Sequence, residues 1–105
     1  MEHVSFVLKI DQQEMEEYKR RHNRVDPELE EQFEAAGIHR YHIFLHEGTL
    51  FAYMEVENFE QAMKHLADHP ANLKWQAFMS DMLQAWEDGS MQKQIPEMYR
   101  FERKG

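Results

Sequence analysis

The spacing of Tyr18 and His22 is the feature of this chain best suited to chemistry. Side chains four residues apart on a helix lie over the same patch of surface, and both belong to a stripe, with Met15 and Val25, where a core would normally have leucine. A phenol and an imidazole there predict a polar pocket in which protons move near neutral pH. The alternative is structural: a packed tyrosine with a hydrogen-bonded histidine, or a frayed helix end facing water.

Two further aromatic residues face the same region if the chain folds as its pattern indicates. Tyr41 alternates with Ile43 and Leu45 on a predicted strand, so its hydroxyl would lie near the inward face of the first helix. Trp75 stands near the start of a later helix, where an indole can form the wall of a pocket and stack on the apolar face of a sugar. Taken alone, a tyrosine such as Tyr41 is more often an ordinary half-buried strand residue, and a tryptophan such as Trp75 is more often a core residue.

Three histidines on one predicted strand, His39, His42 and His46, raise the question of a metal site. His42 and His46 would share one face of the strand and His39 would point the other way. Two aligned imidazoles without a carboxylate at fixed spacing make a poor zinc site. We therefore expect no metal, and we interpret these histidines as surface or dimer-interface residues. A solvated helix face is the simplest interpretation of the acidic run Glu28, Glu30, Glu31 and Glu34.

Composition excludes several classes of function. The 105 residues are enough for a single domain, over residues 1–105. The formal net charge of −8 argues against nucleic acid and anionic membranes as partners, because both need a basic surface. Cysteine is absent, which excludes disulfides, thiolate metal sites and cysteine nucleophiles. No serine stands in a G-x-S-x-G sequence, so serine hydrolase chemistry is not expected, and no glycine-rich loop occurs, so nucleotide binding lacks its usual device.

The sequence also predicts where the protein resides. The first residues, MEHVSFVLKIDQQ, lack the basic region and cleavage site of a signal peptide. No apolar run is long enough to cross a membrane. Together with the absence of cysteine, these features lead us to expect a cytoplasmic protein.

Alternation and helical periodicity predict the order β-α-β-β-α-β, an α+β fold of the ferredoxin-like, split βαβ type. The predicted elements are a strand at 4–10, a helix from Asp11 to about His22 or Val25, a helical piece from Asp26-Pro27 to Gly37, a hairpin over 38–56, a helix from Asn58 to His69-Pro70, a longer helix ending at Asp88-Gly89-Ser90, and a last strand within Pro96–Arg103. Within the longer helix, Phe78, Met82 and Trp86 are assigned to the core.

The open face of this sheet is too apolar for a surface in water. Helices of such a unit cover one face of the sheet, so the other face should be polar. The hairpin strands instead have apolar or aromatic residues on both faces. They alternate Tyr41, Ile43 and Leu45 with His42, Phe44 and His46, and Leu50, Ala52, Met54 and Val56 with Phe51 and Tyr53. We infer that the open face is buried, most simply by a second copy in a two-fold homodimer.

The segment YKRRHNRVDPELEEQF is similar to the first-helix motif of the L-rhamnose mutarotase family. In that motif a tyrosine, a histidine and an asparagine precede a P-E-L triplet, and here they are Tyr18, His22, Asn23 and Pro27-Glu28-Leu29. The similarity continues in the same order through RYHIFL, LFAYMEVE and KWQAFMSDML, so it covers most of the chain. The resemblance implies a dimeric α+β barrel of ferredoxin-like units. It also implies interconversion of the α and β anomers of a free sugar, L-rhamnose in the namesake.

By motif position, the resemblance implies an active site on six residues. They are His22 and Tyr18 as catalytic residues, with Tyr41, Trp75, Asn23 and Gln76 in contact with the sugar. Two positions depart from the family pattern. Asp26 stands where the family commonly has a tryptophan before P-E-L, and Gln76 replaces the second of two tandem tryptophans. These departures concern which sugar fits more than which reaction occurs.

The implied reaction needs one acid and one base, without metal or cofactor. We predict that His22 serves the ring oxygen or the anomeric hydroxyl, while the two tyrosines orient the sugar or share the proton transfer. Two other classes stay open. One is a monooxygenase built on the same kind of dimeric barrel. The other is a non-enzymatic domain whose aromatic pocket binds a small ligand.

Overall fold

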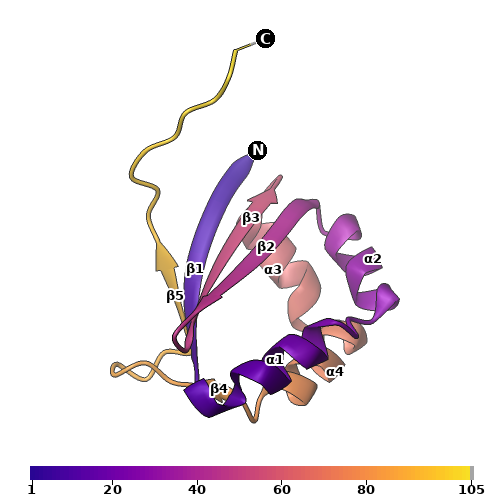
Figure 1. Cartoon of the computed structure of the whole chain (residues 1–105). Helices are drawn as coiled ribbons and strands as arrows, with labels where there is room; N and C mark the ends of the chain where they lie inside the picture. The colour runs from indigo at the N-terminus through magenta and orange to yellow at the C-terminus, as the bar shows by residue number, and fades with distance from the viewer. Residues whose placement is uncertain (105) are drawn as a thin grey trace.

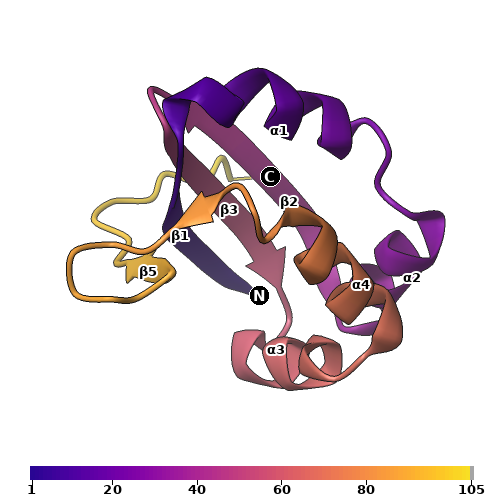
Figure 2. The same ribbon diagram turned by 90° about the horizontal axis from the view of Figure 1, so that it is seen from below.

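The computed structural model describes residues 1–104 and places four helices on one side of a curled antiparallel sheet (Figures 1 and 2). The strands are β1 (Glu2–Ile10), β2 (Ile38–His46), β3 (Thr49–Val56), β4 (Leu83–Gln84) and β5 (Gln92–Ile95). The helices are α1 (Met15–His22), α2 (Pro27–Ala35), α3 (Phe59–Ala67) and α4 (Pro70–Met79), with a 3-10 turn at Gln12–Glu14 before α1. Within residues 1–104, none of the helices combines the length and apolarity that crossing a membrane requires.

The sheet has the strand order β2-β3-β1, and both β4 and β5 pair with the remaining edge of β1. All pairings are antiparallel. The register of β1 with β3 runs without a shift from Glu2 opposite Val56 to Lys9 opposite Thr49. This order, with helices on one face, confirms the predicted ferredoxin-like α+β fold.

The inward side chains of β1 are the base of the core. Val4, Phe6 and Ile10 alternate along the strand toward the helices, and all three are buried. They divide between two apolar clusters. The first cluster lies under α3 and consists of Val4, Phe6, Ile38, Ala52, Met54, Val56, Ala62 and Leu66. The second lies under α1 and the end of α4 and consists of Ile10, Tyr18, Leu50, Met79 and Met82.

Two helices begin where short-range sequence signals predict. The Asp26 carboxylate accepts a hydrogen bond from the backbone N–H of Glu28 (2.9 Å), and Pro27 occupies the first helical position of α2. The Asn58 side chain accepts one from the backbone N–H of Gln61 (3.0 Å) at the start of α3. These caps compensate for the unpaired donors of each first turn, so the helix starts are locally determined.

The later helix is shorter than the sequence predicts. α4 ends at Met79, and Leu83–Gln84 forms β4, which pairs with Lys9 and Ile10 of β1. Met82, in the turn between them, is buried in the second cluster as expected. The apolar periodicity therefore continues beyond the helix because the same residues pack from a turn and a strand.

Two residues that the sequence assigns to the core of that helix lie elsewhere. Phe78 is exposed, and its ring lies beside the guanidinium of Arg21 instead of in either apolar cluster. Trp86 is half-buried at the edge of the sheet, and its indole N–H lies 3.4 Å from the carbonyl oxygen of Val7. The core assignment is thus wrong for these two residues.

The last strand also lies earlier than predicted. β5 pairs with Ser5–Leu8, and Pro96–Arg103 contains no strand. Proline has no backbone N–H to donate, so Pro96 interrupts the ladder directly after Ile95. Beyond it the chain runs away from the body of the molecule (Figure 1), with the side chains of Met98, Tyr99 and Phe101 largely exposed.

The face of the sheet opposite the helices carries the aromatic residues that the alternation predicts. Phe44 of β2 is 62% exposed and lies opposite Phe51 of β3, which in turn lies opposite Val7 of β1. Two residues before Phe44 on β2, His42 lies opposite Tyr53 of β3. We call these five residues together the open-face row: Val7, His42, Phe44, Phe51 and Tyr53.

The turn between β2 and β3 gives a test of backbone geometry. Gly48 has a φ of +81°, and a Cβ there would lie 3.0 Å from the carbonyl oxygen of Ile10. Gly89 has a φ of +87° but no atom within 4 Å of such a Cβ. We expect Gly89→Ala to lower the free energy of unfolding by about 1–2 kcal/mol from left-handed strain. Gly48→Ala should lose roughly 1–3 kcal/mol more from the steric conflict.

Urea unfolding of the two variants measures the difference. Because their φ angles are nearly the same, equal losses would show that the contact with Ile10 has no effect on stability.

Candidate active site

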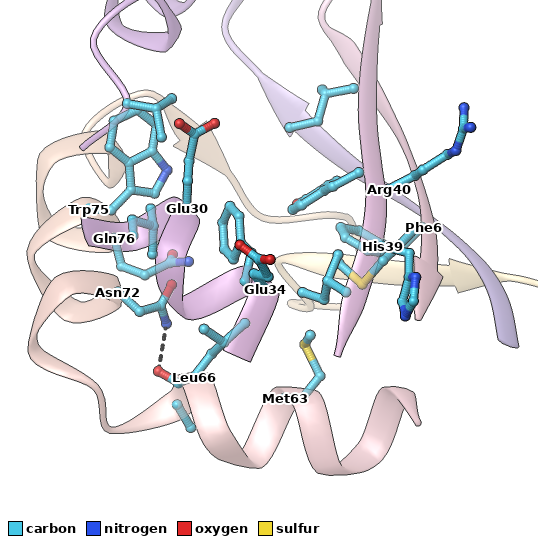
Figure 3. A pocket seen from close by; sticks show the side chains of 18 of the residues that line it. Phe6, Glu30, Glu34, His39, Arg40, Met63, Leu66, Asn72, Trp75 and Gln76 are labelled. Atoms are coloured by element: carbon cyan, nitrogen blue, oxygen red, sulfur yellow. Dashed lines mark hydrogen bonds between the residues drawn. The ribbon is translucent and has the colours of Figure 1, made fainter. Parts of the chain in front are cut away.

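A cavity of about 930 Å³ lies between the helices and the inward face of the sheet (Figure 3). This is near the upper end of the roughly 300–1,000 Å³ typical of ligand pockets. Its apolar lining includes Phe6, Met54 and Leu66 of the first cluster. The polar side chains that line it include His22, Glu30, Glu34, His39, Arg40, Tyr41, Glu57, Asn72 and Gln76. Apolar walls with several polar groups suit a small polar ligand.

His22 is the last residue of α1 and has a defined tautomer. Its Nδ1 lies 3.1 Å from the carbonyl oxygen of Tyr18, one turn earlier in the helix. A carbonyl oxygen can only accept a hydrogen bond, so Nδ1 carries the proton and donates it. The lone pair of the neutral imidazole is then on Nε2, which is the atom able to accept a proton.

The cavity environment sets the charge of these groups. Burial lowers the pKa of His22 from its usual 6.5, and the hydrogen bond to the Tyr18 carbonyl opposes this only in part, so the imidazole is neutral at pH 7. Burial raises the pKa of Tyr41 to about 12. The pKa of Tyr18 is also raised, first by burial and then by the nearby Tyr41. The His22 imidazole is therefore a neutral base, and both tyrosines are protonated phenols.

Tyr18 stands behind His22 and is not part of the cavity lining. Its ring centroid lies 4.3 Å from that of His22, with the planes 34° apart, and the tyrosine is buried. Tyr41 lines the cavity directly and is held by Phe6 and Phe33, with ring centroids 6.2 and 5.6 Å away. Tyr18 thus contacts the imidazole, whereas Tyr41 faces the space that a ligand would occupy.

Trp75 forms an aromatic wall beside the imidazole. The ring centroids of Trp75 and His22 are 5.3 Å apart and their planes meet at 88°, an edge-to-face contact. Asn72, Trp75 and Gln76 of α4 all line the cavity. Asn72 shares a helix face with Trp75 at a spacing of three and with Gln76 at a spacing of four. The Asn72 amide donates to the carbonyl oxygen of Leu66 (3.0 Å), which orients the side chain (Figure 3).

Four of the six residues predicted from sequence line one cavity. They are His22, Tyr41, Trp75 and Gln76. Tyr18 packs in the second apolar cluster and reaches the site only through its contact with the imidazole. Asn23 is exposed after α1, where its backbone N–H donates to the carbonyl oxygen of Arg20 (3.2 Å), and its side chain is not part of the lining.

Several polar residues of the cavity lining, among them Glu30, Glu34 and Asn72, are not indicated by the sequence pattern. Glu30 and Glu34 are exposed, as predicted, but they also line the cavity. Their spacing of four is a signal of a shared helix face, and the same argument joins Asn72 to Gln76. Such spacing does not by itself show where a cavity opens.

The strand histidines lie in three different environments. His42 stacks on Phe44 in the open-face row, with centroids 6.3 Å apart. His46 lies at the exposed turn, and His39 contacts Glu57 at the rim of the cavity (2.7 Å). Across the part of the chain that the structure describes, no three His, Asp or Glu side chains converge in the manner of a metal site.

The fold and this site together define a class of protein. A neutral imidazole, the Tyr41 phenol and an indole wall line a cavity on a ferredoxin-like α+β scaffold, and the Tyr18 phenol lies behind the imidazole. None of the lining residues is a serine, threonine or cysteine. The arrangement is that of a small enzyme that moves protons on a polar ligand.

The comparisons with known proteins identify the family. A family model described as L-rhamnose mutarotase matches residues 3–103. An L-rhamnose mutarotase from Mannheimia succiniciproducens is 40% identical over 87 residues, or 81% of this chain and 83% of that protein. The crystal structure of an L-rhamnose mutarotase from Formosa agariphila, 30% identical, has a TM-score of 0.82 and covers 97% of this chain and 100% of that chain. The chain therefore belongs to the L-rhamnose mutarotase family and is a sugar mutarotase, an isomerase that interconverts anomers.

A more distant likeness concerns the fold alone. A putative antibiotic biosynthesis monooxygenase from Nitrosomonas europaea has a TM-score of 0.62 at 15% identity, covering 89% of this chain and 85% of that chain. The monooxygenase alternative thus has support from the backbone only. The mutarotase relationship has support from both sequence and structure.

The state of His22 is directly measurable. We expect NMR titration of the ¹⁵N-labelled protein to give a pKa below 6.5 for His22 and a neutral form protonated on Nδ1. As the pH falls through that pKa, Nε2 becomes protonated and kcat/KM should decline, whereas activity should persist above it. A pKa at or above 6.5, or a proton on Nε2 in the neutral form, would contradict this assignment.

Proposed function

We propose that the protein interconverts the α and β anomers of L-rhamnose, with His22 as the base at the anomeric hydroxyl. The observation that carries this proposal is the 3.1 Å contact between Nδ1 of His22 and the Tyr18 carbonyl oxygen, which leaves Nε2 as the proton acceptor. Relatives described as L-rhamnose mutarotases support the choice of sugar. The lowered pKa of His22 supports its role as a base.

Ring opening requires two proton movements. Nε2 of His22 takes the proton of the anomeric hydroxyl while the bond between C1 and the ring oxygen breaks, and the Tyr41 hydroxyl gives a proton to the departing ring oxygen. A phenol is a stronger acid than the sugar alcohol that forms, so this transfer is favourable even with the raised pKa of Tyr41.

Ring closure reverses these movements on the other face of the aldehyde. The open sugar rotates about the bond between C1 and C2. The Tyr41 phenolate then takes back the proton of the attacking hydroxyl, and the His22 imidazolium returns its proton to the carbonyl oxygen. Both residues end as they began, with no other group consumed.

The remaining residues position the sugar and the base. In this proposal, Tyr18 supports the His22 ring from behind, and the Trp75 indole covers an apolar face of the sugar. The amides of Asn72 and Gln76 provide hydrogen-bond donors and acceptors for sugar hydroxyls.

The charge of the lining favours a neutral sugar. Glu30, Glu34 and Glu57 line the cavity together with the guanidinium of Arg40. A uronate would add a further negative charge beside these carboxylates, which is unfavourable. L-rhamnose is uncharged, and its methyl group suits the apolar walls.

Saturation-transfer NMR of L-rhamnose tests the activity and the base together. Irradiating H1 of one anomer should reduce the H1 signal of the other when wild-type protein is present and not in its absence. His22→Ala should lose about 10²–10⁴-fold of the catalysed rate. His65→Ala is the matched control, because His65 is exposed on α3 and contacts Gln32 outside the cavity lining. Its rate should equal that of wild type.

Two results would contradict this proposal separately. No transfer with the wild-type protein would show that L-rhamnose is not the substrate. Equal transfer by wild type and His22→Ala would show that the imidazole is not the base.

We further propose that the protein is a homodimer that pairs through the open-face row. Phe44 and Phe51 are exposed there, with no element among residues 1–104 covering them, and exposed patches of this kind mark interfaces. A two-fold axis would bring the same patch of both copies together. The exposed aromatic residues Tyr99 and Phe101, on the segment that leaves the body, add to the apolar surface available for pairing.

Analytical ultracentrifugation measures the predicted assembly. Wild type should sediment as a dimer at micromolar concentration, and Phe44→Asp should shift it toward monomer, because a carboxylate would be buried against apolar surface. Leu73→Asp is the control, since Leu73 is also exposed (53%) but lies on α4. A wild-type monomer, or the same shift with both variants, would refute pairing through this face.

The location and other partners follow from composition. A chain without cysteine has no bond that requires an oxidising compartment, and we propose that it acts in the cytoplasm. Its net charge of −8 disfavours nucleic acid and anionic membranes as partners, so the sugar is the partner proposed here.

A further inference from the structure

Helix α1, which carries His22, has few apolar contacts to hold it. It spans eight residues, of which only Tyr18 is buried. A helix this short is marginal on its own in water. Its placement relative to the other helices therefore depends strongly on contacts made by its polar side chains.

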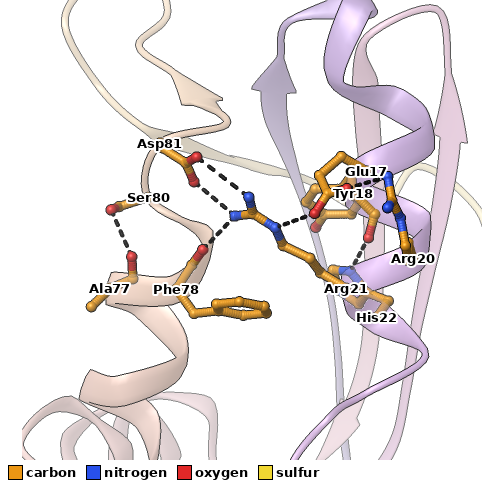
Figure 4. Close-up of polar contacts among 9 residues, drawn as sticks. All are labelled: Glu17, Tyr18, Arg20, Arg21, His22, Ala77, Phe78, Ser80 and Asp81. Carbon is orange, nitrogen blue, oxygen red and sulfur yellow. Dashed lines mark hydrogen bonds and ion pairs between the residues drawn. The ribbon is translucent and has the colours of Figure 1, made fainter.

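Arg21 makes such contacts by reaching from α1 to the end of α4 (Figure 4). Its Nη1 donates to the carbonyl oxygen of Phe78 (2.6 Å) and to Oδ1 of Asp81 (2.8 Å). Its Nε donates to Oε1 of Glu17 (2.9 Å), which holds the guanidinium from its own helix. The Phe78 carbonyl belongs to the last turn of α4, where carbonyls lack helical partners, so Arg21 caps that helix.

An aromatic path connects this contact to the cavity. The Arg21 guanidinium lies 4.8 Å from the centre of the Phe78 ring. Phe78 in turn lies 5.8 Å from Trp75, and Trp75 lies 5.3 Å from His22. Arg21 and His22 are neighbours on α1, and Phe78 and Trp75 both belong to α4. The contacts among these four residues therefore link the two helices at both ends of the path.

We propose that Arg21 and Asp81 are a positioning pair that sets the separation of His22 from Trp75 for mutarotation. The proposal rests on the function proposed above, in which the imidazole acts on a sugar covered by the indole. Neither Arg21 nor Asp81 is among the residues lining the cavity, so neither is a catalytic residue.

The pair is built for geometry more than for stability. The side chain of Asp81 is 66% exposed, and ion pairs with an exposed partner contribute little to stability. The side chain of Arg21 is only 18% exposed, and its planar group serves a carbonyl and two carboxylates at once, which an ammonium cannot match. The hydrogen bond from Arg21 holds the pKa of Asp81 below its usual range, so this carboxylate is charged at pH 7, where His22 is neutral.

Kinetics of a double-mutant cycle test the pair. We expect Arg21→Ala and Asp81→Ala each to lower kcat/KM for L-rhamnose about 10- to 100-fold, as a small displacement of a reacting group does. The double variant should lose no more than Arg21→Ala alone, because the two residues act as one unit. Melting temperatures should fall by about 5 °C or less, given the exposure of Asp81.

Arg20→Ala is the matched control. Arg20 is the same residue type on the same helix, but it pairs with Glu17 and does not reach α4. This variant should keep kcat/KM within about twofold of wild type, as expected for an exposed pair within one helix. Arg21→Lys should recover only part of the activity, because it restores the charge without the planar donor group.

A second measurement does not depend on turnover. The imidazole protons of His22 should show an NMR ring-current shift from Trp75 in wild type and Arg20→Ala, and Trp75→Leu is the reference that lacks the Trp75 contribution but keeps that of Tyr18. Arg21→Ala and Asp81→Ala should move these signals toward the reference.

The outcomes separate this proposal from the proposed function. Unchanged His22 signals in Arg21→Ala and Asp81→Ala, or additive kinetic losses in the double variant, would overturn the positioning pair. A wild-type protein inactive on L-rhamnose, with the His22 signals still shifting in these variants, would refute the substrate and leave the geometric role of the pair supported.

Discussion

The pairing of β1 on both of its edges is the constraint on which the rest of the structure depends. This strand joins β3 along most of its length and also pairs with β4 and β5, so it cannot slip without breaking three ladders. Its inward residues contribute to both apolar clusters, and the helices must return to the same face to cover them. The active-site cavity is the space between that face and four short helices. The side chains of the strands alternate between the two faces of the sheet, so the residues that do not face the helices form the open-face row.

Much of the fold could be predicted because its signals are local. Asp26 with Pro27, and Asn58, start their helices through contacts within three residues, and the hairpin over 38–56 joins neighbours in sequence. The end of α4 and the position of β5 depend on distant partners in β1, which periodicity does not reveal. Apolar residues that continue a helical pattern, such as Met82, satisfy a turn equally well.

The candidate site was predictable to the extent that its residues interrupt an apolar pattern. His22 and Tyr41 were found because burying a polar group on an inward face costs free energy, so such a residue is unusual there. Asn72 and Glu30 were missed because a polar residue on an exposed helix face is ordinary, and only the position of the cavity makes it unusual. Arg21 is the extreme case: its partner Asp81 is 60 residues away, so no local spacing indicates the contact.

The edge-to-face contact between His22 and Trp75 has an optical consequence. Indole emission is quenched more strongly by a protonated imidazole than by a neutral one, so the brightness of Trp75 follows the charge of the histidine beside it. The chain's other tryptophan, Trp86, lies at the sheet edge near Lys9 and Lys93 and does not share that neighbour. The protein therefore contains its own fluorescent indicator of the protonation state of its active site, readable without a label or a substrate.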